Sequence, residues 1–487
     1  MINRPYTITG MLLVASLSGG CAVGPDFVRP STAVMSSFVT AQKNGDSRQT
    51  QINGDFEQNL HEGNAVPTEW WTLFGSSALN ELVAAAQTKN PDLQAAEAAL
   101  RVAQENAAAQ RGSYLPAVDL HVTPVRQSVA RNLASPLSSN ASLYTLHTAQ
   151  LSISYAPDIF GATRRQVEAT DAEKEVVRFQ YEAARLTLTA NLVVAAINAA
   201  ALQAQLDSTI ALVHDARQQL AAVQRQYELG QLGAAEVAAQ ETALAQTEAT
   251  LPPLEKQIAQ QHHLLAVLAG RFPSDTSLQH LTFDSLRLVK DLPLSVPAHL
   301  VEQRPDIRAA EAQLHAASAQ IGIAKAARLP NISLTAALGS SALTPSTLFK
   351  SGTGFWSIGA DLVQPLYKGG TLMHQQRAAE AAYDQAAAQY QGVVLTAFQN
   401  VADTLCALEA DAKAARIASA AERAAKKSLM ISRRQWELGM VAYPAVLIAQ
   451  QAYHQAAITL IQTQAARYAD TVALFQALGG GQLLATQ

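Results

Sequence analysis

The sequence predicts a mainly helical protein with a small β part, built by duplication of one structural unit. Separated motifs recur in the same order at a nearly constant spacing of 209–214 residues. Two segments, 162–229 and 371–438, contain no proline and only one glycine, Gly392, which is expected of long uninterrupted helices. Short stretches in which apolar and polar residues alternate precede both segments, and this alternation is typical of strands.

The composition excludes several classes of protein. Of the 487 residues, 49% are hydrophobic and 15% are charged, against roughly 25% charged in typical soluble proteins. The 35 basic and 39 acidic residues form no long run of one sign, so no nucleic-acid partner is expected. Cys21 and Cys406 are the only cysteines, which excludes a disulfide scaffold and a zinc cluster.

The first twenty residues have the pattern of a secretory signal peptide. Arg4 precedes an apolar stretch from Ile8 to Leu17, which is too short to span a bilayer. Small residues, Ser18 to Gly20, then precede Cys21. This arrangement resembles a bacterial lipoprotein signal, in which the cysteine thiol is acylated, for example with palmitate, and becomes the new N-terminus. The alternative is an ordinary signal peptide that leaves Cys21 as a free thiol.

The repeat divides the chain that follows the signal. Residues 90–98 align with 304–312, and the hexapeptide 225–230 aligns with 434–439. We therefore expect a signal peptide at 1–20, an N-terminal lipid-anchored extended segment at 21–80, a first repeat at 81–271, a proline-rich linker at 272–297, a second repeat at 298–478 and a C-terminal tail at 479–487.

Each repeat begins with a helix and a β-hairpin. The helices start after Pro91 and Pro305, because proline suits the first turn. Alternating apolar residues then predict hairpins at 117–156 and 331–365. The apolar positions are Val118, Leu120, Val122, Leu151, Ile153 and Tyr155 in the first repeat, and Ile332, Leu334, Trp356, Ile358, Ala360 and Leu362 in the second.

Long helical hairpins, expected at 162–270 and 371–477, complete the repeats. Each rod of about 100 Å ends at a glycine, Gly230 or Gly439, and return helices begin near Ala234 and Pro444. Apolar residues step by three and four along both rods, as in coiled-coil packing. They are Val176, Phe179, Ala183, Leu186, Ala190, Val193 and Ile197, and Tyr383, Ala387, Tyr390, Val394, Ala397 and Val401.

Taken together, these features resemble the TolC-like outer-membrane efflux factors, lipoprotein branch, over essentially the whole mature chain. The resemblance rests on the start from Cys21 to Pro30, the duplicated plan, the junctions 157–161 and 364–370, and the two tip motifs. It implies a homotrimer that combines a twelve-stranded outer-membrane barrel, four strands per chain, with a coiled-coil periplasmic tunnel. It also implies a passive exit duct for small toxic compounds or drugs, working with a periplasmic adaptor and an inner-membrane transporter.

The residues independently require oligomerisation if the strands enter a membrane. Four short strands leave unpaired edges that lipid does not tolerate, and membrane barrels have about eight strands or more. The apolar residues of the hairpins would then face lipid. Polar residues at the alternating positions would face a water-filled lumen, or the open face of a soluble sheet in the alternative; they include Asp119, His121, Ser152, Ser154 and Asp361.

The resemblance assigns adaptor contacts to the two hairpin tips. Leu229, Leu232, Leu438 and Val441 would be the apolar contacts, and the glycines 230 and 439 would set the turns. The alternative is that these residues only cap the helices.

The resemblance also assigns the periplasmic aperture to residues beside the tips. Glu236 would supply an acidic ring, and Arg434, Trp436 and Tyr443 would constrict the aperture or latch the hairpins. Relatives often carry an arginine and two aspartates after the second tip glycine. This chain has Val441, Ala445 and Ile448 at those positions, which argues against a carboxylate ring there.

No enzymatic chemistry is expected. The sequence has no phosphate-binding glycine loop, no zinc-protease motif and no nucleophile elbow, so we expect no catalytic residue, metal or cofactor. The adjacent histidines 262 and 263 diverge on a helix and cannot chelate one metal. Two alternatives to an efflux duct remain, namely the duct of a type I protein secretion system and a periplasmic coiled-coil scaffold without a pore.

Overall fold

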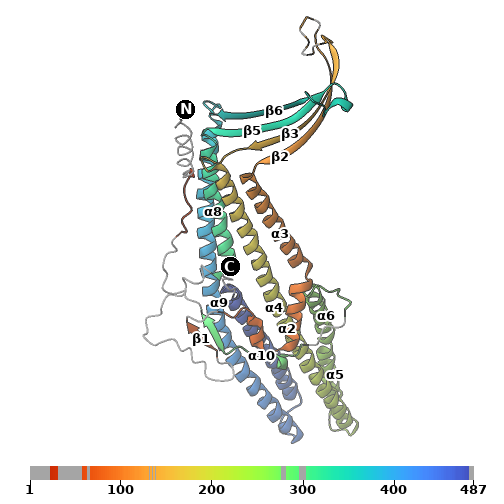
Figure 1. Cartoon of the computed structure of the whole chain (residues 1–487). Coiled ribbons are helices and arrows are strands. Elements are labelled where there is room, and N and C mark those ends of the chain that lie inside the picture. The colour runs from red at the N-terminus through yellow and green to blue at the C-terminus, as the bar shows by residue number, and fades with distance from the viewer. Residues whose placement is uncertain are drawn as a thin grey trace, which may run out of the picture. The chain divides into compact units, whose positions relative to one another are not determined.

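The computed structural model is mostly helical, with strands in two small sheets (Figure 1). It describes residues 22–30, 58–62, 66–130, 132–133, 135, 137, 139–275, 281–294 and 303–481. Cys21 and the expected signal peptide therefore lie outside the described residues. The predominantly helical fold class is confirmed.

Both repeats show the same order of elements. The first contains α2 (Ser77–Lys89), α3 (Pro91–Arg111), β2 (Ala117–Ser128), β3 (Leu143–Tyr155), α4 (Ala162–Glu228), α5 (Ala234–Glu248) and α6 (Leu251–Leu268). The second contains α8 (Pro305–Ala326), β5 (Asn331–Ala342), β6 (Gly354–Val363), α9 (Thr371–Glu437) and α10 (Pro444–Ala477). The remaining elements are β1 (Asn59–Glu62), β4 (Asp291–Leu294) and short 3₁₀ turns at Trp70–Phe74, Gly112–Tyr114, Phe283–Ser285 and Pro345–Thr347.

The return helix of the first repeat is broken, whereas that of the second is continuous. The sequence predicted one return helix in each repeat. Helix α5 ends at Glu248 and α6 begins at Leu251, because Pro252 and Pro253 follow at once and proline rings clash with the preceding turn of a helix. Helix α10 contains no interior proline and runs for 34 residues.

The chain packs as two compact units that do not coincide with the two repeats. The first unit takes the described residues of Met1–Arg29, Arg101–Val176 and Ala310–Tyr390. The second takes those of Pro30–Leu100, Val177–Ala309 and Gln391–Gln487. Each unit thus draws segments from both copies, because the long helices belong partly to one unit and partly to the other.

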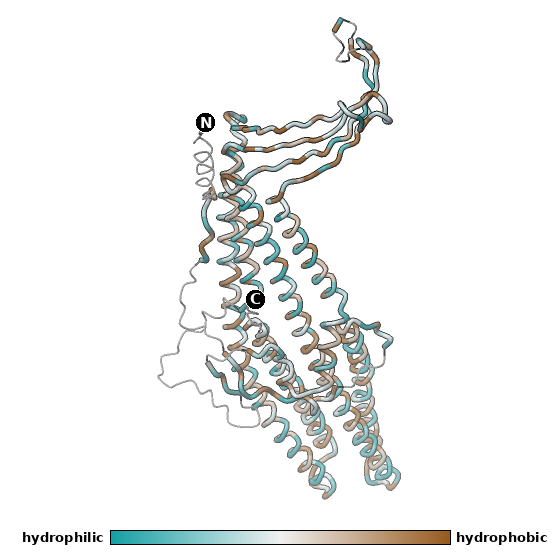
Figure 2. The backbone as a smooth tube through the Cα atoms, in the orientation of Figure 1, coloured by the Kyte–Doolittle hydropathy of each residue, from teal (hydrophilic) through white to brown (hydrophobic). Residues whose placement is uncertain are grey.

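The first unit contains a four-stranded antiparallel sheet in the order β2-β3-β5-β6. Its register aligns Leu120 with Leu151, Leu151 with Leu338, and Leu338 with Trp356, so these four side chains lie in one row. Asp119 pairs with Ser152 in the next row, on the opposite face. Figure 2 shows the resulting alternation of hydrophobic and hydrophilic residues along the strands. One face is therefore apolar and the other polar.

Short hydrogen-bonded caps connect the sheet to the long helices. Asp158 follows β3, and its carboxylate accepts hydrogen bonds from the backbone N–H groups of Thr163 (3.0 Å) and Arg164 (2.8 Å). These donors have no partner inside the helix, so Asp158 fixes the start of α4.

The segment from Ala22 to Arg29 is held against α4 and α8 in the first unit. The buried Arg165 side chain donates to Asp26 Oδ1 (2.7 Å) and to the Val23 carbonyl (3.3 Å). The Phe27 ring stacks on His315 with centroids 4.4 Å apart. A Cβ atom on Gly24 would lie 2.5 Å from the Gly322 Cα atom. The chain that directly follows Cys21 is thus docked in a fixed place.

The main hydrophobic core lies in the second unit. Trp70 and Phe475 stack with ring centroids 5.3 Å apart, and both side chains are buried. The parallel strands β1 and β4 pair beside this core, since Leu292 of β4 belongs to it. The sequence interpretation missed β4, because its four residues lie in the proline-rich linker and include Pro293.

The duplication extends to single hydrogen bonds at the ends of the return helices. Asn90 Nδ2 donates to the carbonyl of Leu268 (3.1 Å) at the end of α6. Arg304 Nη1 donates to the carbonyl of Ala477 (2.9 Å) at the corresponding place of α10. Both donors immediately precede the proline that starts the first helix of their repeat.

Among the described residues, only α4 contains an 18-residue stretch that is long and apolar enough to cross a membrane as a helix. More than half of this stretch (56%) is buried. Helix α4 contributes core residues such as Val193 and Ile197, so packing against neighbouring helices explains its apolar composition.

Candidate functional site

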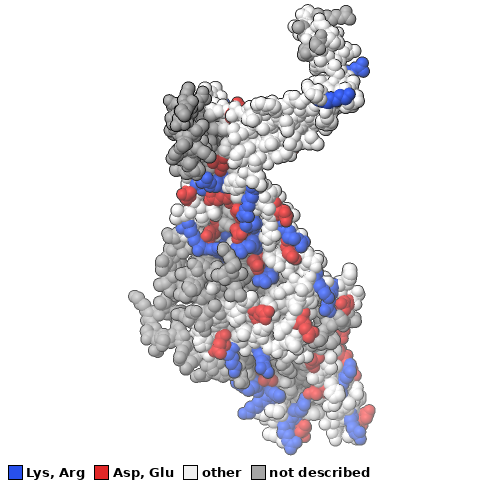
Figure 3. Space-filling view, in the orientation of Figure 1, with Lys and Arg blue, Asp and Glu red and all other residues white. Residues whose placement is uncertain are grey.

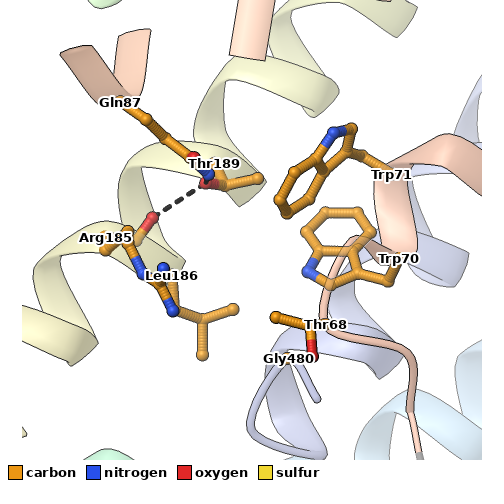
Figure 4. Close-up of a pocket in the computed structure, with 8 residues that line it drawn as sticks. All are labelled: Thr68, Trp70, Trp71, Gln87, Arg185, Leu186, Thr189 and Gly480. Atoms are coloured by element: carbon orange, nitrogen blue, oxygen red, sulfur yellow. Dashed lines mark hydrogen bonds between the residues drawn. The ribbon is translucent and has the colours of Figure 1, made fainter. Parts of the chain in front are cut away.

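A cavity beside two adjacent tryptophans is too small to bind a ligand. Figure 4 shows Trp70 and Trp71 facing Leu186 and Thr189, and Thr189 Oγ1 donates to the Arg185 carbonyl (2.9 Å). The volume is about 20 Å³, enough for one water molecule. This cavity is a packing feature of the second unit.

The tips of the two helical hairpins have the same backbone geometry. Gly230 has a φ of 71°, and the N–H of Gln231 bonds to the Gln226 carbonyl (2.9 Å). Gly439 has a φ of 70°, and the N–H of Met440 bonds to the Gln435 carbonyl (2.8 Å). This is the Schellman cap, which favours glycine because of the positive φ. The predicted turn role of both glycines agrees with this geometry.

The caps leave apolar side chains in solvent at the end of each hairpin. Leu229 is 66% exposed, Leu438 is 59% exposed and Met440 is 68% exposed. Leu232 and Val441 are half-buried, and Leu232 packs against the small core between the hairpins. Of the four expected apolar contacts, two are therefore exposed and two are half-buried. Met440, which was not expected, joins the exposed ones.

Tyr443 ties the second hairpin to the first. Its side chain is 2% exposed, and its hydroxyl donates to Gln240 Oε1 on α5. Gln240 is fully buried and donates in turn to the Ala216 carbonyl on α4 (3.0 Å). Burial raises the pKa of Tyr443 to about 12, so the hydroxyl keeps its proton at neutral pH. The sequence did not reveal Gln240, because only the folded chain brings α5 against Tyr443.

The other aperture candidates have different partners. Trp436 is half-buried and meets Tyr443 edge-on, with ring centroids 5.1 Å apart. The Glu236 carboxylate accepts a bond from the Gly233 N–H (3.1 Å) and so caps α5. Arg434 is exposed and pairs with Glu437 (3.0 Å) one turn along the same helix. Its neighbour Arg433, which the sequence analysis did not select, approaches Asp215 across the hairpins at 3.8 Å.

A larger cavity lies between the hairpins in the second unit. Its volume is about 170 Å³, and its lining includes Leu212, Gln246, Gln450 and His454. Burial lowers the pKa of His454, which favours the neutral ring. The polar lining and the volume suit several water molecules.

The second tip carries no carboxylate at positions 441, 445 and 448. Val441 and Ala445 are half-buried, and Ile448 is 68% exposed. Over the described part of the chain, no group of three or more His, Cys, Asp or Glu side chains has the arrangement needed to hold a metal ion.

A pair of carboxylates, Asp411 on α9 and Asp470 on α10, gives the second unit a pH-dependent stability. Burial raises the pKa of Asp470 from 3.8 to about 6, and a hydrogen bond to Asp411 and its charge add to this effect. The folded chain therefore holds this proton more tightly than the unfolded chain. The free energy of unfolding must fall as the pH rises from about 4 through about 6.

We expect Asp470→Asn to raise the free energy of unfolding by about 1 kcal/mol at about pH 7.5. The substitution removes the cost of burying the charge and the repulsion from Asp411, and partial exposure to solvent reduces both. At about pH 4 the substitution should have little effect, since Asp470 is then protonated. Thermal melting at the two pH values measures the difference. Asp403→Asn, at an exposed position of α9, is the control. Equal stabilisation at both pH values would contradict the assignment.

The family model described as "Outer membrane efflux protein" matches residues 82–271 and 296–480. The two matched segments correspond closely to the two repeats and together cover most of the chain. The description is that of a membrane efflux protein and does not name an enzymatic activity.

Individual relatives span nearly the whole chain. The pyoverdine export outer membrane protein OpmQ of Pseudomonas putida is 30% identical over 421 residues, which cover 86% of this chain and 89% of the relative. The toluene efflux pump outer membrane protein TtgF of Pseudomonas putida is 29% identical and covers 95% and 94%. The crystal structure of the outer membrane protein VceC from Vibrio cholerae superposes with a TM-score of 0.79 at 27% identity, covering 85% of this chain and 99% of that one.

Proposed function

The chain belongs to the outer membrane efflux protein family, and from this premise we propose that it is the outer-membrane duct of a tripartite pump for small toxic compounds. An inner-membrane transporter supplies the energy, and a periplasmic adaptor connects the two. The duct itself is passive and extends into the periplasm of a Gram-negative bacterium.

The four-stranded sheet is the observation that carries this proposal. Its apolar face includes Leu120, Trp356 and Ile358, which are 70%, 72% and 78% exposed in the single chain. Water would not support such a continuous apolar face, whereas lipid does. The strands have 10 to 13 residues, enough to cross a bilayer when tilted.

The polar face of the sheet lines the duct. Asp119 pairs with Ser152, and Asp361 pairs with Ser333, so the polar residues expected in the lumen share one face. The face opposite Leu120 is thus suited to water.

Three copies close the barrel. Strands β2 and β6 are the two edges of the sheet, and unpaired strand edges are not tolerated in lipid. Joining β6 of one copy to β2 of the next gives twelve strands in a closed ring. The long helices of the three copies then form the periplasmic tunnel.

The exposed tips are the adaptor site. Leu229, Leu438 and Met440 provide apolar surface at the ends of the hairpins, with glycine caps that hold it outward. Leu232 and Val441 support these tips from the half-buried side. The hydrogen bond between Tyr443 and Gln240 latches the two hairpins in the resting, closed aperture. Glu236, Trp436 and Arg434 shape the turn regions around it.

Small molecules are favoured over proteins as cargo. The relatives named above are described as exporting pyoverdine and toluene, both of which are small molecules. A lipid-anchored start at Cys21 agrees with the efflux branch of the family.

Two measurements test the proposed duct: the mass of the purified protein in detergent and its conductance in planar bilayers. A trimer that conducts weakly supports the closed duct, whereas a monomer that never conducts would exclude a pore. Extraction of the Cys21→Ser variant separates a barrel from a lipid-anchored scaffold. The barrel needs detergent even without the acyl chain, while a scaffold becomes soluble.

A further inference from the structure

The two helical hairpins of one chain carry opposite charges near their tips. On α9, the stretch 413–434 contains seven basic residues and one acidic residue, Glu422. The corresponding stretch of α4, residues 204–225, contains two of each. Helix α5, which returns from the first tip, has three glutamates and no basic residue. Figure 3 shows Lys and Arg side chains at the hairpin tips, and others farther along the helices.

Several of the basic side chains have no carboxylate partner within the described chain. Three of the seven basic side chains do have a carboxylate partner: Lys413 pairs with Glu409, Arg434 with Glu437, and Arg433 with Asp215. The others are exposed, and among the described residues none has a carboxylate within 4.0 Å. They form what we call the basic stripe, which consists of Arg416, Arg423, Lys426 and Lys427.

The basic stripe has the spacing of one helix face. Arg416 and Arg423 are seven residues apart, and Lys427 follows four residues later, so the three side chains lie on the same side of α9. Ile417 and Met430, beside the stripe, are 70% and 59% exposed. Apolar side chains flanked by charges are typical of a helix surface that packs against another helix.

The first hairpin carries a complementary set of exposed carboxylates. We call Asp207, Glu228 and Glu241 the acidic patch. Within the described residues, none of the three has a basic group within 4.0 Å. Asp207 and Glu228 are three heptads apart and therefore share a side of α4 in a coiled coil. Ile210, one turn from Asp207, is 50% exposed.

The contacts inside one chain leave both patches free. The hairpins of one copy meet through Tyr443 and Gln240 and through Arg433 and Asp215. These residues belong to neither patch. A molecule with two different complementary patches can associate head to tail, and such an interface closes into a ring when the rotation fits.

We infer that the basic stripe of one copy docks on the acidic patch of the next copy, so that opposite charges hold neighbouring hairpins together around the tunnel. The inference rests on the proposed trimeric duct. It adds which surface of one hairpin contacts which surface of the neighbouring copy. It predicts an interface that weakens with salt, because the charges are at the surface.

Charge reversal tests this interface in the full-length protein. The variants are Arg423→Glu with Lys427→Glu, Asp207→Lys with Glu228→Lys, and the combination of all four. The control is Lys350→Glu with Lys368→Glu, which makes the same change of charge at exposed positions of the first unit. The readout is the temperature at which the detergent-solubilised trimer dissociates, at about 50 mM and about 500 mM salt.

We expect each double reversal to lower the dissociation temperature by about 5 °C at low salt and by less at high salt. The fourfold variant should regain most of the loss, and the control should match the wild type. If the wild type is trimeric and neither reversal changes its dissociation, the inference is wrong and the trimeric duct stands. If reversal leaves the trimer intact but abolishes efflux in cells, the stripe binds a different, acidic partner, which also contradicts the inference. A wild-type protein that is monomeric and never conducts would instead exclude the proposed function.

Discussion

We expect Tyr443→Phe to raise the fraction of time that the purified channel is open by about tenfold in planar bilayers. The substitution removes only the hydroxyl that donates to Gln240, and it keeps the ring against Trp436. Gln240 is fully buried, so its Oε1 atom is then left without this donor, at a cost of about 1–3 kcal/mol to the closed state. In an open state the Gln240 side chain can reach water instead.

The control for this prediction is Tyr453→Phe. Tyr453 is half-buried on α10, which begins directly after Tyr443, and it packs against the same small core. Loss of its hydroxyl should leave the conductance unchanged. If the two variants conduct equally, the bond between Tyr443 and Gln240 does not latch the hairpins. A Gln240→Leu variant should behave like Tyr443→Phe, because it also removes the bond.

The largest effect on stability is expected from Gly270→Ala. Gly270 follows α6 with a φ of 68°, a conformation that L side chains rarely adopt. A Cβ atom there would lie 2.3 Å from the Lys89 carbonyl oxygen, a backbone atom that cannot move aside alone. We expect the free energy of unfolding to fall by about 3 kcal/mol or more. Urea unfolding followed by the helical circular dichroism signal measures it.

Gly230→Ala is the matched control, because Gly230 has the same cap and a φ of 71°. No atom lies within 4 Å of the position that its Cβ would take. This substitution should therefore cost only the backbone penalty, about 1 kcal/mol. Similar losses for both variants would show that the close approach of Lys89 to Gly270 contributes nothing.

The order of the main helices and strands could be predicted because local sequence signals and tertiary structure agree. The absence of proline, with Gly392 as the one glycine in the two segments, predicts α4 and α9, whose observed ends at Glu228 and Glu437 adjoin the glycine caps. Alternation predicts the strands, and the register then places Leu120 and Trp356 on one face. These features depend on neighbours in sequence or on simple periodicity.

The candidate site was predicted only in part. The glycine caps follow from local geometry, but the partner of Tyr443 depends on how α5 packs against α10. The family resemblance assigned Arg434 to the aperture, whereas Arg433 is the residue that approaches the other hairpin. The role of Arg165 in holding residues 22–29 was also hidden, since its partners lie about 140 residues away.

The break between α5 and α6 gives the two hairpins different stiffness. A helix resists bending through its continuous ladder of hydrogen bonds, and two consecutive prolines interrupt that ladder at Thr250. The return segment of the first hairpin can thus bend between α5 and α6, whereas that of the second hairpin is one continuous helix of 34 residues, α10. In the proposed ring of three copies, flexible first hairpins alternate with stiffer second hairpins. The stiffness of the six hairpins therefore has threefold and not sixfold symmetry. A force applied at the tips would therefore bend the first hairpin and tilt the second.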